Sequence, residues 1–107
     1  MLTDQAIRDA ARRAAAAASS AAKVIVFGSY ARGDADEGSD LDLLVVENEV
    51  ADKATEYLNI HRAVGIMGVG VDVLIFSRLE FERRRQVPGT LPYWASKEGK
   101  VLYDAAA

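Results

Sequence analysis

Three aspartates in two apolar segments have the spacing of a metal site. Asp40 and Asp42 are two residues apart where a strand is expected to begin, so both side chains point to one face of that strand. Adjacent carboxylates repel each other unless a cation lies between them, and Mg²⁺ is a hard ion that binds carboxylate and phosphate oxygens. Asp72 lies in a second apolar strand, where a lone carboxylate is costly. If the two strands are neighbours, the three carboxylates could hold two metal ions for in-line phosphoryl or nucleotidyl transfer.

A glycine–serine turn precedes the aspartate pair. Gly28 follows an apolar strand, and glycine lets the backbone come close to a ligand. Ser29 precedes a predicted helical turn, whose N–H groups would bind phosphate together with the Ser29 hydroxyl. Ten residues separate Ser29 from Asp40. Taken singly, each feature has a plain alternative in a turn or a solvated carboxylate; their coincidence favours a site for phosphate and metal.

The elements that would position these residues form one domain over residues 1–107, since domains typically have about 100–150 residues. Apolar runs predict strands at 23–27, 41–46 and 71–76, with a possible edge strand at 101–103. Helical patterns and caps predict helices at 4–21, 50–64, about 77–86 and 90–99, and one helical turn at 30–32. The expected buried stripe of the second long helix is Val50, Ala54, Tyr57, Leu58, His61 and Val64.

The composition excludes several classes of protein. The chain has no cysteine, which excludes disulfide scaffolds and thiolate metal sites and fits a reducing compartment. Its single histidine excludes a multi-histidine zinc site and argues against a Ser-His-Asp triad. The net charge of −3 disfavours strong direct binding of nucleic acid. No apolar run approaches the roughly 20 residues of a membrane span. We therefore expect a cytoplasmic protein that does not associate with membranes.

Three further features leave alternatives open. His61 shares a helical stripe with apolar residues, which favours a partly buried structural role over a catalytic one. The basic run Arg83–Arg85 fits a solvated helix face, or a surface for an acidic partner or RNA. Tyr93 and Trp94 fit either the core or an exposed anchor for a partner, because aromatic residues are enriched in interface hot spots.

Residues 24–46, VIVFGSYARGDADEGSDLDLLVV, resemble the signature of the DNA polymerase β-type nucleotidyltransferase superfamily: Gly-Ser, ten residues, then Asp-x-Asp. Within that superfamily, GSYARG and SDLDLLV closely resemble the minimal nucleotidyltransferases of prokaryotes, the MNT proteins. The motif core covers about 20 residues, and the element order and Asp72 extend the resemblance over most of the chain.

The resemblance implies a fold and a set of site residues. The fold would be the α+β nucleotidyltransferase fold, a small mixed sheet of three or four strands covered by helices. Gly28 and Ser29 would bind the phosphates of the nucleotide, and Arg32 would order the loop or contact phosphate. Asp40, Asp42 and Asp72 would be catalytic and would hold Mg²⁺, with two ions expected. Asp72 would also help to activate an attacking hydroxyl.

The resemblance also implies a reaction and a partner. MNT proteins are commonly antitoxins paired with a HEPN toxin, and the family activity transfers AMP from ATP to a tyrosine of that toxin, an RNase. We therefore expect a Mg²⁺-dependent protein adenylyltransferase in a hetero-oligomer with such a toxin. Two alternatives remain: a non-catalytic antitoxin that neutralises its partner by steric contact, and a nucleotidyltransferase that acts on a small molecule.

Overall fold

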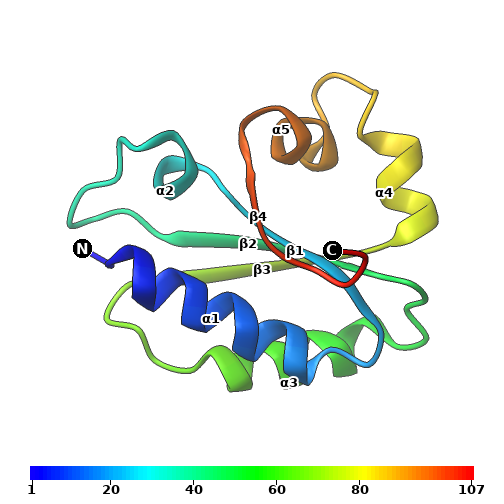
Figure 1. Cartoon of the computed structure of the whole chain (residues 1–107), viewed down its shortest axis with the longest axis horizontal. Helices are drawn as coiled ribbons and strands as arrows, with labels where there is room; N and C mark the ends of the chain where they lie inside the picture. Colours follow the sequence, from blue (N-terminus) through cyan, green and yellow to red (C-terminus); the bar gives the residue numbers. More distant parts are fainter.

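The structure is a computed structural model that describes residues 1–107. In chain order, its elements are α1 (Asp4–Ala17), β1 (Ala21–Phe27), α2 (Ser29–Arg32), β2 (Leu41–Glu47), α3 (Lys53–Val64), β3 (Val71–Ser77), α4 (Arg78–Arg84), α5 (Leu91–Glu98) and β4 (Lys100–Asp104) (Figure 1). This is the order predicted from the sequence, and the possible edge strand near the end is confirmed as β4. No helix has the length and apolar character needed to cross a membrane.

The four strands form one mixed sheet in the order β3-β2-β1-β4. β1 runs antiparallel to β2 and to β4, whereas β2 and β3 are parallel. Two neighbouring parallel strands need a long crossover connection, and α3 lies in the connection between β2 and β3. The expected α+β fold with a small mixed sheet is therefore confirmed.

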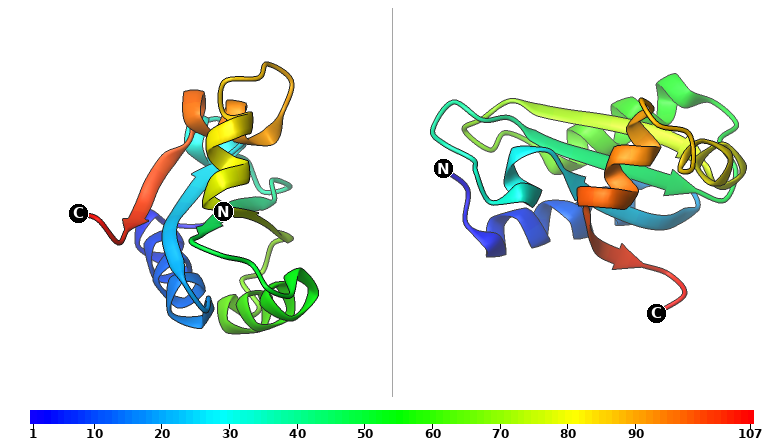
Figure 2. Two further views of the ribbon diagram at one scale, coloured as in Figure 1. Left: turned by 90° about the vertical axis from the view of Figure 1, so that its right-hand side faces the viewer. Right: turned by 90° about the horizontal axis from the view of Figure 1, so that it is seen from above.

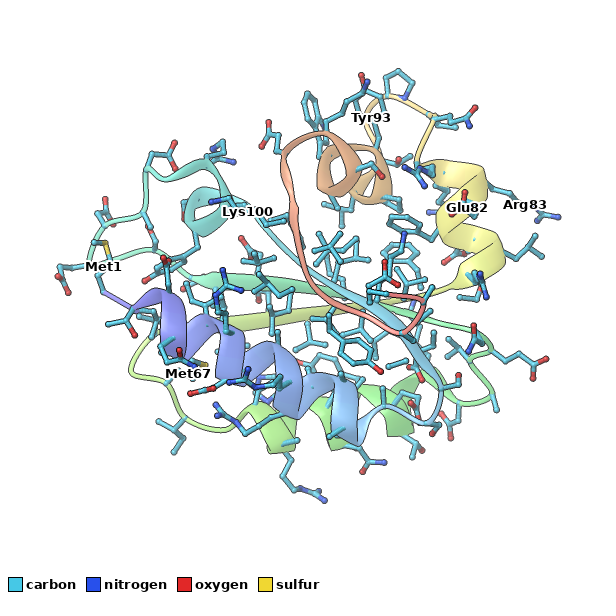
Figure 3. All side chains as sticks on the ribbon, viewed as in Figure 1. Met1, Met67, Glu82, Arg83, Tyr93 and Lys100 are labelled. Carbon is cyan, nitrogen blue, oxygen red and sulfur yellow. The ribbon has the colours of Figure 1, made fainter.

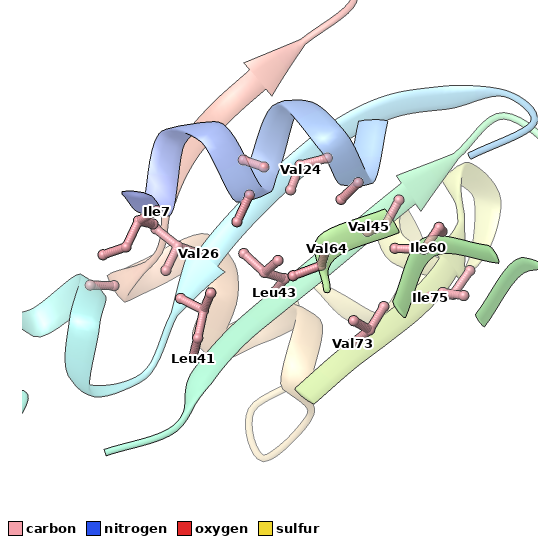
Figure 4. Close-up of a cluster of buried hydrophobic side chains, with 14 residues drawn as sticks. Ile7, Val24, Val26, Leu41, Leu43, Val45, Ile60, Val64, Val73 and Ile75 are labelled. Carbon is pink, nitrogen blue, oxygen red and sulfur yellow. The ribbon is translucent and has the colours of Figure 1, made fainter. Parts of the chain in front are cut away.

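Helices cover both faces of the sheet. α1 and α3 lie on one face, and α4 and α5 lie on the other (Figures 1 and 2). Leu41, Leu43 and Val45 of β2 point into the larger core beneath α1 and α3 (Figure 4). Leu44 and Val46 point into the second core, with residues of α4 and α5. Because side chains alternate along a strand, Asp42 belongs to the α4/α5 face of the sheet.

The first helix ends earlier than its alanine-rich sequence predicts, at Ala17, and the strand after it begins at Ala21. Tertiary hydrogen bonds explain the difference. The backbone N–H and the hydroxyl of Ser19 donate to the Glu56 carboxylate at 2.9 and 2.6 Å. The Ser20 hydroxyl donates to the carbonyl of Glu49 at 3.1 Å. These partners lie far along the chain and draw both serines out of the helix.

The second long helix differs from its prediction in start and orientation. α3 begins at Lys53, after Asp52, whose side chain caps it. Its buried residues are Glu56, Ile60 and Val64, whereas three residues of the expected stripe, Ala54, Tyr57 and Leu58, are exposed. The hydrogen bonds that bury Glu56 turn the face of the helix that carries Glu56 toward the core, in place of the expected apolar stripe. His61 is partly buried and stacks on Tyr57, with ring centroids 5.4 Å apart.

Candidate active site

Asp42 and Asp72 lie side by side on neighbouring strands. The parallel register of β2 and β3 pairs the two residues directly. Asp42 is half-buried and Asp72 is exposed. Burial, followed by a hydrogen bond and the charge of Asp72, raises the pKa of Asp42 from an ordinary 3.8 to about 6. The sequence predicted that Asp42 and Asp72 meet only if their strands are neighbours, and β2 and β3 are neighbours.

Asp40 lies directly before β2 and is exposed. Its carboxylate lies against Gly70, where a Cβ atom would collide with it. The Leu41 N–H donates to the Gly70 carbonyl at 2.8 Å, which fixes this approach. The sequence indicates only that Gly70 is part of a turn. Its position two residues before Asp72 is the signal that could have indicated its contact with the site.

The glycine–serine turn lies against the same pair of aspartates. Phe27, the last residue of β1, is the register partner of Asp42, so Gly28 follows directly beside that carboxylate. Gly28 has a φ of 75°, and a Cβ there would collide with the Asp42 carboxylate. Only glycine meets both conditions. α2 begins at Ser29, and the first N–H groups of a helix have no intrahelical partner. The turn therefore presents backbone donors next to Asp42.

Arg32 connects α2 to a second element. Its Nε donates to the Asp34 carboxylate at 3.2 Å, and its guanidinium also donates to Glu98 of α5 at 3.3 Å. The hydrogen bond to Asp34 and then that to Glu98 raise the pKa of Arg32. Arg32 thus contacts its own loop and also joins α2 to α5.

An open pocket of about 350 Å³ lies between α2 and α5. It is lined by Phe27, Gly28, Arg32, Leu91, Trp94 and Glu98. Sequence reasoning missed the contribution of α5 and left the position of Trp94 open. The structure places Trp94 in the pocket wall with 47% of its surface exposed. No local sequence signal indicates that α5 packs beside α2.

The carboxylate pair fits a divalent cation. No group of three or more carboxylate or imidazole side chains is arranged to hold a metal ion by itself. Mg²⁺ at nucleotide sites, however, is typically bound through one or two carboxylates together with substrate phosphates. Asp42 and Asp72 supply that number, beside a turn with free backbone donors. The larger set that includes Asp40 stays a prediction.

The sequence is similar to proteins from an archaeon. A relative from Methanocaldococcus jannaschii, "Putative protein adenylyltransferase MJ0604", is 35% identical over 85 residues, which are 76% of this chain and 77% of that protein. "Putative protein adenylyltransferase MJ0141", from the same organism, is 61% identical over 28 residues. That second match is local, since it covers 26% of this chain and 28% of the relative.

Two crystal structures share the fold. One, described as a toxin-antitoxin with AMP-PNP, superimposes with a TM-score of 0.67 and 19% identity, covering 96% of this chain and 74% of that one. A chain from Sulfolobus solfataricus, described as a "putative nucleotidyltransferase", gives a TM-score of 0.61 and 19% identity, covering 95% of this chain and 80% of that one. The family model described as "Nucleotidyltransferase domain" matches residues 7–97. Because that match spans most of the chain, the protein belongs to the nucleotidyltransferase domain family.

Proposed function

We propose that this nucleotidyltransferase transfers AMP from ATP to a hydroxyl group of a partner protein. The acceptor in this proposal is a tyrosine of a HEPN-type RNase toxin, and the chain acts as its antitoxin. One observation carries the catalytic part: Asp42 and Asp72 are paired in register beside the Gly28 turn. The adenylyltransferase name of the relative from M. jannaschii and the toxin-antitoxin description of a structural neighbour support the acceptor and the partner.

The roles of the residues follow from their positions. The backbone donors after Gly28, the Ser29 hydroxyl and Arg32 would bind the phosphates. Asp42 and Asp72, with Asp40 beside them, would hold Mg²⁺, which stabilises the negative charge that develops during phosphoryl transfer. Since ATP is the donor, we place the protein in the cytoplasm.

The transfer balances without a further reactant. The acceptor oxygen attacks the α-phosphorus of ATP, the bond from that phosphorus to the bridging oxygen breaks, and pyrophosphate leaves. The hydroxyl proton passes to the exposed Asp72 carboxylate and from there to water. Asp40 and Asp72 are both exposed, so the acceptor approaches from solvent. That openness favours a protein acceptor, whose surface would itself exclude water from the site.

The test is the intact mass of the partner that co-purifies with the chain, before and after incubation with MgATP. We expect the partner to gain one or more AMP groups. Asp42→Asn keeps the shape of the side chain and removes its charge, so the transfer rate is expected to fall about 100-fold or more, as when one preorganised electrostatic contact is lost. Asp36→Asn is the matched control: Asp36 lies in the exposed loop, and Asn keeps the oxygen that accepts from Gly38.

The alternatives give different results. A partner that is bound and neutralised equally well by the Asp42→Asn variant, and gains no mass with the wild type, would replace this proposal with the steric antitoxin. AMP transfer to a small molecule with no protein modification would establish the small-molecule enzyme instead. Undiminished protein modification by Asp42→Asn would refute the role given to the aspartate pair.

A further inference from the structure

We propose that the pocket between α2 and α5 holds the base of the nucleotide, stacked on the indole of Trp94. This inference rests on the proposed function and assigns the part of the substrate that the aspartates and the glycine–serine turn leave unaccounted for. Figure 2 (right) shows α2 and α5 side by side on one face of the sheet.

The pocket and the phosphate turn share residues. Gly28 and Arg32 line the pocket, and Gly28 also lies beside the Asp42 carboxylate. A nucleotide with its phosphates on the donors after Gly28 therefore has the pocket immediately next to it. A volume of about 350 Å³ lies at the lower end of the range for small-molecule sites, roughly 300–1,000 Å³. It leaves room for one aromatic ring system.

Trp94 lies in the pocket wall and is exposed enough to serve as a stacking surface. Almost half of its side chain is exposed, and so is 43% of Leu91 on the same wall. Tyr93 packs edge-on against the indole, with centroids 5.2 Å apart and an angle of 82°. Figure 3 shows Tyr93 on α5, above the sheet. This contact orients the indole before any ligand binds, and stacking of a base on an aromatic side chain does not depend on the identity of the base.

The wall that carries Trp94 is held by packing. Glu98 of α5 is bonded to Arg32 of α2, which joins the two sides of the pocket. At Gly99, a Cβ would collide with the Ala95 carbonyl and with Ile25 of β1, so the end of α5 lies directly on the sheet. A pocket held in this way is preformed, and the base need not order it.

Trp94 is the only tryptophan of the chain, so its fluorescence reports on this pocket alone. We would titrate the protein with ATP and, separately, with inorganic tripolyphosphate, both with Mg²⁺. ATP is expected to change the fluorescence saturably, because the base stacks on the indole. Tripolyphosphate is expected to bind, as measured by calorimetry, without that change. An equal fluorescence change with both ligands would overturn the proposal.

Substitutions test the same point through affinity. Trp94→Ala is expected to raise the Kd for ATP about 5- to 100-fold, which corresponds to the loss of about 1–3 kcal/mol of base stacking. The Kd for tripolyphosphate should stay unchanged, and Trp94→Phe should retain most of the affinity for ATP. Tyr57→Ala is the matched control, since Tyr57 is 40% exposed on α3, on the opposite side of the sheet.

The outcomes separate this proposal from the proposed function. An unchanged Kd for ATP in Trp94→Ala overturns the base pocket, and if transfer to the partner falls all the same, the pocket receives the acceptor instead. ATP binding that depends on Trp94, in a protein that modifies nothing, would leave the base pocket standing and refute the transferase proposal. An equal loss of affinity for ATP and tripolyphosphate in Trp94→Ala would show a structural effect of the substitution. That result would also overturn the base pocket.

Discussion

Replacing Glu47 by glutamine is expected to stabilise the protein above pH 7. The Glu47 side chain is fully buried, and its Oε2 has no hydrogen-bond partner. Its Oε1 accepts from the Ser20 N–H at 3.3 Å, and a second carboxyl group, that of Glu56, lies beside it. Burial, followed by the neighbouring carboxyl group of Glu56, raises the pKa of Glu47 from an ordinary 4.5 to about 7. The folded protein therefore binds this proton more tightly than the unfolded chain does.

The size of the effect follows from that difference in pKa. Each pKa unit corresponds to about 1.36 kcal/mol, so the stabilising contribution of protonated Glu47 is about 3 kcal/mol at most. It is complete below pH 4.5 and is lost as the pH rises through about 7. The pKa of Glu56 is lowered, chiefly by the Ser19 hydroxyl, so its own contribution is lost only as the pH falls below 4.5. The interval from pH 5 to 8 therefore isolates Glu47 from Glu56.

Urea unfolding of the wild type and of Glu47→Gln from pH 5 to 8 measures the effect. The amide introduced by the substitution stays neutral and donates to Glu56 at every pH. The free energy of unfolding of the variant should therefore rise relative to that of the wild type as the pH rises. At pH 8 the variant should be about 2–3 kcal/mol more stable than the wild type. The raised pKa of Asp42 acts in the same direction in both proteins and cancels in the difference. Glu49→Gln, an equal change at an exposed position, should leave the profile as it is. A difference between wild type and Glu47→Gln that does not vary with pH would refute the reasoning.

Two further substitutions test contacts described above. Gly28→Ala is expected to abolish transfer and to cost about 2 kcal/mol or more in urea unfolding, because it adds backbone strain at a φ of 75° and displaces the Asp42 carboxylate. Gly33→Ala, at a φ of 85° with open space around it, should show the strain alone, and equal losses in the two variants would contradict the contact. Ser19→Ala removes the hydroxyl bond to Glu56 and should cost about 1–2 kcal/mol; an unchanged urea midpoint would show that this bond contributes nothing.

Local signals predicted the elements and the starts of three helices. Thr3, Ser77 and Thr90 each cap the helix that follows them, as their sequence positions indicate. The last helix ends before Gly99, which caps α5. Gly99 is extended, with a φ of −73°, and its lack of a side chain serves close packing against Ala95 and Ile25. Capping depends on neighbours three residues away, whereas that packing depends on the sheet.

The parts that escaped prediction depend on contacts between distant residues. The end of α1 and the buried face of α3 are both set by Glu56, whose partner Ser19 lies 37 residues away. Helical periodicity predicts that an acidic residue is exposed, so it could not have predicted that Glu56 is buried. In the site, the aspartates and the glycine–serine turn were visible as a motif, but the wall that carries Trp94 depends on how α5 packs beside α2.

The position of β1 inside the sheet bears on how the chain is made in the cell. β1 lies between β2 and β4, and β4 comprises residues 100–104, so one edge of β1 can be paired only after those residues have left the ribosome. Until then, the apolar run Val24–Phe27 carries an open edge that other nascent chains could extend. Translation that stops before residue 100, or proteolysis that removes β4, would leave an aggregation-prone remnant for the cell's quality-control machinery.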